Sequence, residues 1–288
     1  MYPFSIGVML DSFRKPRLEA LKNAHDVGAT GIQVYATKGE MAPENLTTQM
    51  RREFLAQVKD HGLTISALCG DLGRGFGNAE LNPQLIEKSK RILDLAKELE
   101  TDVVTTHIGV VPSDSSHPRY SIMQDACGQL ASYADSLNAH FAIETGPETS
   151  AVLKGFLDGL HSTGVAVNLD PANLVMVTGD DPVAAVHKLK DYIVHTHAKD
   201  GRKLCDKNPE IIYGIAADPS VVTDPAFIEL PLGQGDVDFE GWLKALNEIG
   251  YKGFFNLELS TGGLPKSTAQ PFLNFAGAVA RCLADTAL

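Results

Sequence analysis

The sequence of 288 residues has no long apolar run. No stretch approaches the ~18 apolar residues that a transmembrane helix needs, so a membrane protein is not expected. The amino-terminal stretch MYPFSIGVMLDSFRK lacks a basic region, and its apolar residues end at Asp11. It therefore does not read as a signal peptide.

Cysteine is scarce, and positive charge is outnumbered. Four cysteines lie far apart, with no Cys-x-x-Cys pair: Cys69, Cys127, Cys205 and Cys282. A chain of this length does not depend on disulfides, so we expect reduced thiols and a cytoplasmic protein. The formal net charge is −11, and an acidic surface repels a phosphate backbone, so nucleic acid is not an expected partner.

Eight short apolar runs alternate with longer amphipathic segments. The runs are residues 5–10, 31–36, 63–69, 102–109, 140–146, 165–170, 192–197 and 253–259. Most are apolar at nearly every position, which is typical of strands buried on both faces of a parallel sheet. Helical patterns lie at 16–29, 47–62, 82–100, 118–138, 149–162, 181–190, 238–249 and 266–285. In the first of these, the spacing predicts that Leu18, Leu21 and Ala24 share one stripe.

Eight β/α units in order predict a (β/α)8 TIM barrel, with a doubly wound open sheet as the alternative. No Gly-x-Gly-x-x-Gly motif follows the first strand, which disfavours the open sheet. We expect a single TIM-barrel domain over residues 1–288 with an extended loop at 199–237. Because this loop follows the seventh strand, it should lie over the carboxyl end of the barrel, where barrel active sites lie.

The last four predicted strands all end in ionisable side chains. These are Glu144, Asp170, His197 and Glu258. The strand ends of a barrel converge, and three carboxylates there repel one another by several kcal/mol unless a cation lies among them. One imidazole and three carboxylates suit Mn²⁺, Mg²⁺ or Co²⁺ and can bind Zn²⁺. The alternatives are a polar core network and, for Asp170 alone, an N-cap of the helix that follows.

Residues near these strand ends have further interpretations. His195 shares a strand face with His197, and we expect it one layer deeper, where it supports the metal ligand or fills the barrel interior. Phe76 could cap a sugar ring or anchor its loop. The glycines of GQG at 233–235 permit close backbone approach, although a simple turn explains them equally well. Trp242 lies in a helical pattern and is expected in the core.

The phrases AIETG, VNLDPANL, VHTHAKD, LPLGQGDVDF and FFNLELS follow one another in this order. With them the sequence resembles the xylose isomerase-like TIM-barrel superfamily of sugar (or sugar phosphate) isomerases and epimerases. That superfamily also contains ketose 3-epimerases, inosose dehydratases and endonuclease IV. The resemblance covers nearly the whole chain. It implies an isomerase or epimerase of carbohydrate metabolism with one divalent metal ion per chain, manganese first, and a homodimer of such barrels acting on a small-molecule sugar.

The resemblance also assigns residues. It implies that the metal ligands are Glu144, Asp170, His197 and Glu258, and that Glu144 and Glu258 also move protons. It implies substrate contacts for His107, Asn173, Lys199 and Arg202. Asn173 departs from the family, which often has a histidine three residues after the aspartate of the sixth strand. An amide can hydrogen-bond a sugar hydroxyl, but it is a poor zinc ligand.

The implied reaction is proton abstraction next to a carbonyl group, through an enediolate. The metal would polarise the carbonyl oxygen, one glutamate would remove the proton, and the other would return a proton on the opposite face. An inosose-type dehydratase (a lyase) is the alternative. A non-catalytic sugar- or metal-binding barrel and an endonuclease IV-like nuclease are less favoured. The nuclease would need a further aspartate–histidine pair, and residues 199–237 contain no histidine.

Overall fold

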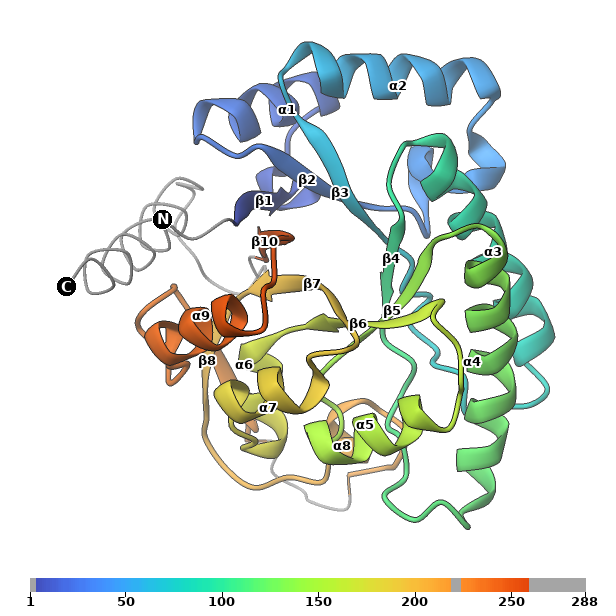
Figure 1. Cartoon of the computed structure of the whole chain (residues 1–288), viewed down its shortest axis with the longest axis vertical. Coiled ribbons are helices and arrows are strands. Elements are labelled where there is room, and N and C mark those ends of the chain that lie inside the picture. The colour runs from blue at the N-terminus through green and yellow to red at the C-terminus, as the bar shows by residue number, and fades with distance from the viewer. Residues whose placement is uncertain (1–3, 219–223, 259–288) are drawn as a thin grey trace.

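The computed structural model describes residues 4–218 and 224–258 and contains a closed barrel of eight parallel strands (Figure 1). The barrel strands are β1 (Ser5–Met9), β2 (Gly31–Tyr35), β3 (Thr64–Cys69), β4 (Val103–Thr106), β5 (His140–Glu144), β6 (Val165–Leu169), β7 (Ile193–Ala198) and β10 (Phe254–Leu257). They follow one another around the barrel in chain order, and β10 closes it by pairing with β1. Each predicted run coincides with one of these strands to within a few residues, and the run at 192–197 stops one residue before the end of β7, so the predicted TIM barrel is confirmed.

Helices cover the outside of the barrel (Figure 1). They are α1 (Arg17–Asp26), α2 (Thr48–Asp60), α3 (Asn82–Glu98), α4 (Pro118–Ser136), α5 (Ser150–Asp158), α7 (Pro182–Leu189) and α9 (Phe239–Glu248). The short η1 (Leu10–Phe13), η2 (Gly39–Met41), η3 (Pro43–Asn45) and α6 (Pro171–Asn173) lie in connections, and α6 continues into a π-helical turn, η4 (Leu174–Thr178). The helix expected at 266–285 lies outside the described residues. Within them, no helix is both long and apolar enough to span a membrane.

Side-chain caps and apolar faces explain where these helices begin and how they pack. Thr47 accepts a hydrogen bond from the Met50 amide at the start of α2, and Thr149 caps α5 in the same way, which satisfies otherwise unpaired helix N–H groups. Trp242 on α9 is fully buried, as expected. The predicted stripe of α1 is wrong for Leu18, which is 55% exposed, because Ala20 is the residue that packs inward.

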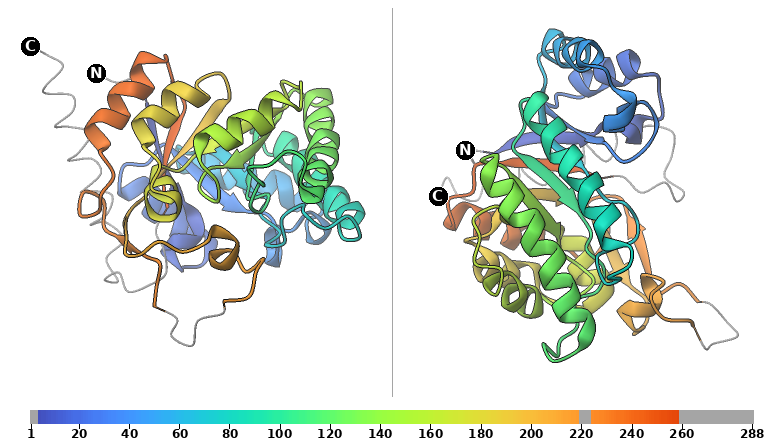
Figure 2. Two further views of the ribbon diagram at one scale, coloured as in Figure 1. Left: turned by 90° about the horizontal axis from the view of Figure 1, so that it is seen from below. Right: turned by 90° about the vertical axis from the view of Figure 1, so that its right-hand side faces the viewer.

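The connection at 199–237 has secondary structure of its own. An antiparallel pair, β8 (Asp200–Lys203) and β9 (Phe227–Leu230), and a short helix, α8 (Pro209–Ile212), form within it. Figure 2 shows this orange segment standing out from one side of the barrel. The hairpin was not predicted, because its first strand, DGRK, is polar and contains a glycine, which is atypical of strands.

Asp200 anchors this segment from inside. Its buried carboxylate accepts four backbone N–H groups, from Gly201, Gly233, Gly235 and Val237. A Cβ atom on Gly235 would lie 2.1 Å from Asp200 Oδ1, so only glycine fits there. The GQG stretch is therefore a turn around a carboxylate of the same chain.

Candidate metal centre and active site

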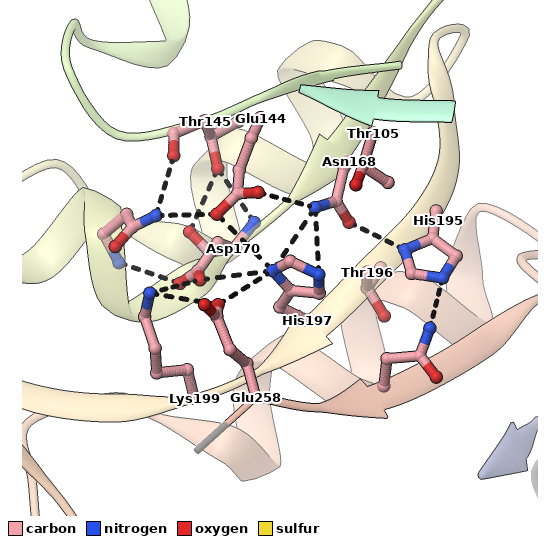
Figure 3. Close-up of polar contacts among 12 residues, drawn as sticks. Thr105, Glu144, Thr145, Asn168, Asp170, His195, Thr196, His197, Lys199 and Glu258 are labelled. Carbon is pink, nitrogen blue, oxygen red and sulfur yellow. Dashed lines mark hydrogen bonds and ion pairs between the residues drawn. The ribbon is translucent and has the colours of Figure 1, made fainter. Parts of the chain in front are cut away.

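Four ionisable side chains meet at the carboxyl end of the barrel (Figure 3). They are Glu144 at the end of β5, Asp170 after β6, His197 on β7 and Glu258 after β10. One ligand atom from each lies within 4.8 Å of the others. The structure thus brings together the four residues that the sequence predicts as metal ligands.

The imidazole of His197 lies at the centre of this cluster. Its Nδ1 atom lies 3.1 Å from Glu258 Oε2, 3.4 Å from Glu144 Oε1 and 3.6 Å from Asp170 Oδ2. The other ring nitrogen, Nε2, points away from the carboxylates and lies 2.9 Å from Gln33 Oε1. One edge of the ring therefore faces the candidate metal position, and the opposite edge faces the barrel interior.

Asp170 serves two purposes with its two oxygens. Oδ1 accepts a hydrogen bond from the Asn173 amide (2.9 Å) and caps α6, as the N-cap interpretation predicts. Oδ2 faces the cluster, is buried, and accepts no hydrogen bond from the described residues. Lys199 Nζ lies 3.0 Å from this oxygen and forms an ion pair with it. Asp170 can therefore cap α6 with one oxygen and bind a metal ion with the other.

The two glutamates are held very differently. Asn173 Nδ2 (3.0 Å) and Asn168 Nδ2 (3.1 Å) donate to the two oxygens of Glu144, and His107 Nε2 lies 3.5 Å from one of them. The side-chain polar contacts of Glu258 with described residues all go through Oε2, to His197 and to Lys199 Nζ at 3.2 Å. Its side chain is 24% exposed. Glu144 is fixed, whereas one oxygen of Glu258 has no partner within the described part of the chain.

Opposite charges keep the cluster ionised despite its burial. Burial opposes ionisation of Glu144, but His107 and His197 bring its pKa down to about 2. Burial likewise opposes the charge on Glu258, and Lys199 and His197 hold its pKa well below the ordinary value. The same carboxylates outweigh burial and raise the pKa of His197 and of Lys199 well above their usual ranges.

The donor set fits one divalent cation. Three carboxylates face one ammonium group, that of Lys199, and an imidazole that must release its Nδ1 proton to bind a metal, so negative charge remains for a cation to balance. Asp170 Oδ2 is buried and contacts only the charged groups of the cluster among the described residues, so it is the kind of atom that a metal ion would satisfy. Metal–ligand bonds of about 2.0–2.2 Å allow two ligands of one ion to be about 4.4 Å apart at most, so the cluster needs little contraction.

The structure places the four predicted substrate-contacting residues in different settings. Lys199 is buried inside the cluster, and His107 stands at its edge, with its ring 5.9 Å from that of Tyr213 on the long loop. The side-chain nitrogen of Asn173 donates hydrogen bonds to Glu144 and to the Thr145 carbonyl oxygen. Arg202 pairs with Asp236 on the surface and makes no contact with the four predicted ligands.

Two other expectations are also resolved by the packing. Phe76 is buried and packs edge-on against Phe141 with ring centroids 6.0 Å apart, so it anchors its loop. His195 lies one layer below His197, with ring centroids 5.8 Å apart. Burial lowers its pKa well below the ordinary value, so it is neutral. It fills the barrel interior as a hydrogen-bonded imidazole.

Several side chains near the cluster were not assigned from the sequence. Burial raises the pKa of three of them, and the charges of the cluster act on them to a lesser extent: Tyr35, Tyr213 and Glu229. Cys69, named above only as one of the four separated cysteines, ends β3 and is buried, and burial raises the pKa of its thiol to about 12. Burial also raises the pKa of Glu148 to about 8, although one of its oxygens accepts the Val111 amide. Tyr35 ends β2, and this position is the one sequence signal that could have placed it near the cluster. No local sequence pattern indicates that the other residues lie there.

Comparisons with known proteins agree with this architecture. The sequence family described as xylose isomerase-like TIM barrel matches residues 21–274. A xylose isomerase domain protein from Planctomyces limnophilus is 24% identical, with a TM-score of 0.74 and coverage of 98% of this chain and 96% of that one.

Two further solved structures have the same fold. A probable 3-DHS dehydratase of Bacillus anthracis is 20% identical, with a TM-score of 0.72, over 96% of this chain and 99% of its own. A D-tagatose 3-epimerase-like protein, for which no organism is given, is 16% identical with a TM-score of 0.73, over 98% of this chain and 97% of its own. At these identities, the likeness concerns the fold.

Proposed function

Because this chain belongs to the xylose isomerase-like TIM-barrel family, we propose that it is a divalent-metal-dependent sugar isomerase or epimerase. The observation that carries the proposal is that two glutamates from different strands meet at the same nitrogen of one imidazole. Glu144 and Glu258 come from β5 and β10, and both lie within 3.4 Å of His197 Nδ1. Such a pair supplies the two carboxylates that proton removal and return require.

A divalent ion held by Glu144, Asp170, His197 and Glu258 would polarise a substrate carbonyl group and make the neighbouring C–H more acidic. Glu258 is the better placed to remove that proton, because its Oε1 has no partner among residues 4–218 and 224–258. Its low pKa keeps it ionised and ready to accept. Glu144 faces the same space from the opposite side of the cluster; it would take up a proton from a substrate hydroxyl group or from water and deliver it to the carbon from that side.

The surrounding residues orient the substrate and shield the reaction from water. Lys199 and His107 offer hydrogen-bond donors beside the two glutamates. Tyr213, carried by the long loop, lies next to His107 and helps to cover the site. These donors and rings suit the hydroxyl groups and C–H faces of a sugar or sugar phosphate.

A lyase of the dehydratase type is a second candidate, and Glu148 favours it. Burial keeps its carboxyl group protonated near neutral pH, and one of its oxygens has no partner among the described residues. Loss of a hydroxyl group as water needs an acid that donates a proton to it, and a neutral carboxylic acid can do so. The probable 3-DHS dehydratase with the same fold catalyses a reaction of this class by its name.

The test has two parts, metal content and proton exchange. Elemental mass spectrometry of protein reconstituted with Mn²⁺ should find about one ion per chain, and Glu144→Gln should lose it. The loaded protein is then incubated with a panel of ketoses in D₂O. Deuterium incorporation next to the carbonyl supports the isomerase or epimerase, whereas an unsaturated product supports the lyase.

Variants at the glutamates sharpen the result. Glu258→Gln should lower exchange by several orders of magnitude, whereas Glu240→Gln, on the exposed face of α9, should leave it unchanged. Sugar binding without exchange would indicate a binding barrel. About three zinc ions per chain together with cleavage of an abasic duplex would indicate a nuclease, and no metal under any condition would refute the proposal.

A further inference from the structure

A layer of polar side chains crosses the barrel interior beneath the cluster. Six strands contribute to it, through Gln33, Ser66, Thr105, Asn168, His195 and Asn256, and all six residues are buried. TIM-barrel interiors are mostly filled by branched apolar residues. Buried polar groups are costly unless they are paired, so the hydrogen bonds of this layer, here called the interior polar layer, need an explanation.

The Glu144 carboxylate sets the direction of the first hydrogen bonds in the interior polar layer. A carboxylate only accepts, so Asn168 must present its amide nitrogen to Glu144 (3.1 Å). Its carbonyl oxygen then faces His195 Nδ1 at 2.8 Å and accepts the proton of that nitrogen. On the other edge of the His195 ring, Nε2 faces Asn256 Nδ2 and accepts a hydrogen bond from it, so the ring proton is on Nδ1.

The same logic continues from Asn256 to Gln33. Asn256 Nδ2 also faces Ser66 Oγ (2.7 Å) and Gln33 Oε1 (3.3 Å). The Gln33 amide nitrogen donates to Thr105 Oγ1 at 2.8 Å. Both contacts turn the Gln33 carbonyl oxygen toward His197 Nε2, which lies 2.9 Å away. The reversed amide would set the Gln33 nitrogen against the Asn256 nitrogen, donor against donor.

We propose that Gln33 is a positioning residue that fixes the tautomer of His197. Its carbonyl oxygen accepts the Nε2 proton, so the Nδ1 lone pair points at Glu144, Asp170 and Glu258. Metal-binding histidines commonly donate their second N–H in this way, and loss of the partner costs 10–100-fold in metal affinity. This inference rests on the metal site of the proposed function and adds to it a residue from β2, on the far side of the barrel.

The test compares three variants of the full chain. Gln33→Met has a similar length but no acceptor, Gln33→Glu keeps an acceptor, and Thr105→Val removes the hydrogen bond that orients Gln33. Isothermal titration with Mn²⁺ should show an affinity loss of about 10–100-fold for Gln33→Met, a smaller loss for Thr105→Val, and near wild-type binding for Gln33→Glu. Circular dichroism checks that each variant is folded, and Thr105→Val answers the question if Gln33→Met does not fold.

A second readout observes the tautomer directly. Nitrogen-15 NMR of the Zn²⁺-loaded wild-type protein should show the proton of His197 on Nε2 and the metal on Nδ1. Wild-type Mn²⁺ affinity in Gln33→Met, or metal on Nε2 in the wild type, would overturn this inference and leave the proposed function standing. Failure of the wild-type protein to bind any divalent ion would overturn both.

Discussion

Lys199 places its ammonium group 3.0 Å from Asp170 Oδ2, inside the ring of carboxylates that would hold a divalent ion. It also lies 3.2 Å from Glu258 Oε2. A lysine in this position partly neutralises the carboxylates and repels a second cation. Lys199 and the metal therefore compete for the same negative charge.

Replacement of Lys199 by methionine should tighten metal binding and weaken catalysis. Loss of the ammonium group removes a repulsion from the cation, and we expect Mn²⁺ affinity to rise about tenfold, or about 1.4 kcal/mol. Turnover should fall, because a donor beside Glu258 is lost. Lys88→Met, on the exposed surface of α3, is the control for titration calorimetry. Unchanged affinity in Lys199→Met would show that the ammonium group does not compete with the metal.

Metal should stabilise the folded protein. A ligand present at a hundred times its dissociation constant adds about 2.7 kcal/mol, which corresponds to a rise in Tm of about 4–5 °C for a chain of this size. Calorimetric scans with Mn²⁺ and with EDTA measure the difference. The rise should vanish in Glu144→Gln, since the ion then lacks a ligand, and a rise that persisted there would place the ion elsewhere.

The Asp200 carboxylate should be essential for the long loop. Asp200→Asn would turn an amide N–H₂ toward two of the four N–H groups that the carboxylate now accepts. Unsatisfied buried groups cost about 1–3 kcal/mol. We expect faster proteolysis within residues 203–227 and a higher KM, with turnover less affected. Asp236→Asn, at the exposed partner of Arg202, should have a much smaller effect; equal sensitivity of both variants would contradict the anchoring role.

The Glu148 carboxyl group predicts a loss of stability at high pH. Its pKa of about 8 in the folded protein exceeds the ordinary value of about 4.3. At low pH, the group is protonated in both states and adds no pH dependence. As the pH rises toward 8, the unfolded chain releases a proton that the folded chain retains, so stability falls by up to about 1.4 kcal/mol per pH unit.

Glu148→Gln removes this dependence. Urea denaturation in EDTA at about pH 5 and about pH 9 should show similar stability for both proteins at the lower pH. The variant should be the more stable protein at the higher pH. If the two proteins lost stability in parallel, Glu148 would not be the group responsible.

The barrel and the four clustered residues were predictable from the sequence because each leaves a local signal. A strand buried on both faces is a continuous apolar run, and an ionisable residue at its end, such as Asp170 or His197, interrupts that pattern. Convergence of these ends follows from barrel geometry alone. The order of strands around the barrel and the position of the cluster needed no further information.

The rest depends on contacts between distant residues. Gln33 lies within the apolar run GIQVYA, and only its partners on other strands reveal why a polar side chain stands there. The hairpin of β8 and β9 forms around the Asp200 carboxylate, and three of its four partners lie more than thirty residues away. Arg202 lies only a few residues after β7 in the sequence, yet the hairpin turns its side chain toward Asp236.

Closure of the barrel by β10 has a consequence for how the protein is made. This strand pairs with β1 on one side and with β7 on the other, and Glu258 follows directly after it. During synthesis, the strand that closes the barrel and the last of the four clustered side chains thus leave the ribosome together. A chain interrupted before β10 leaves the edges of β1 and β7 unpaired and lacks Glu258. Such a chain could not assemble the complete cluster, so binding of a metal ion by all four residues requires that β10 has been synthesised.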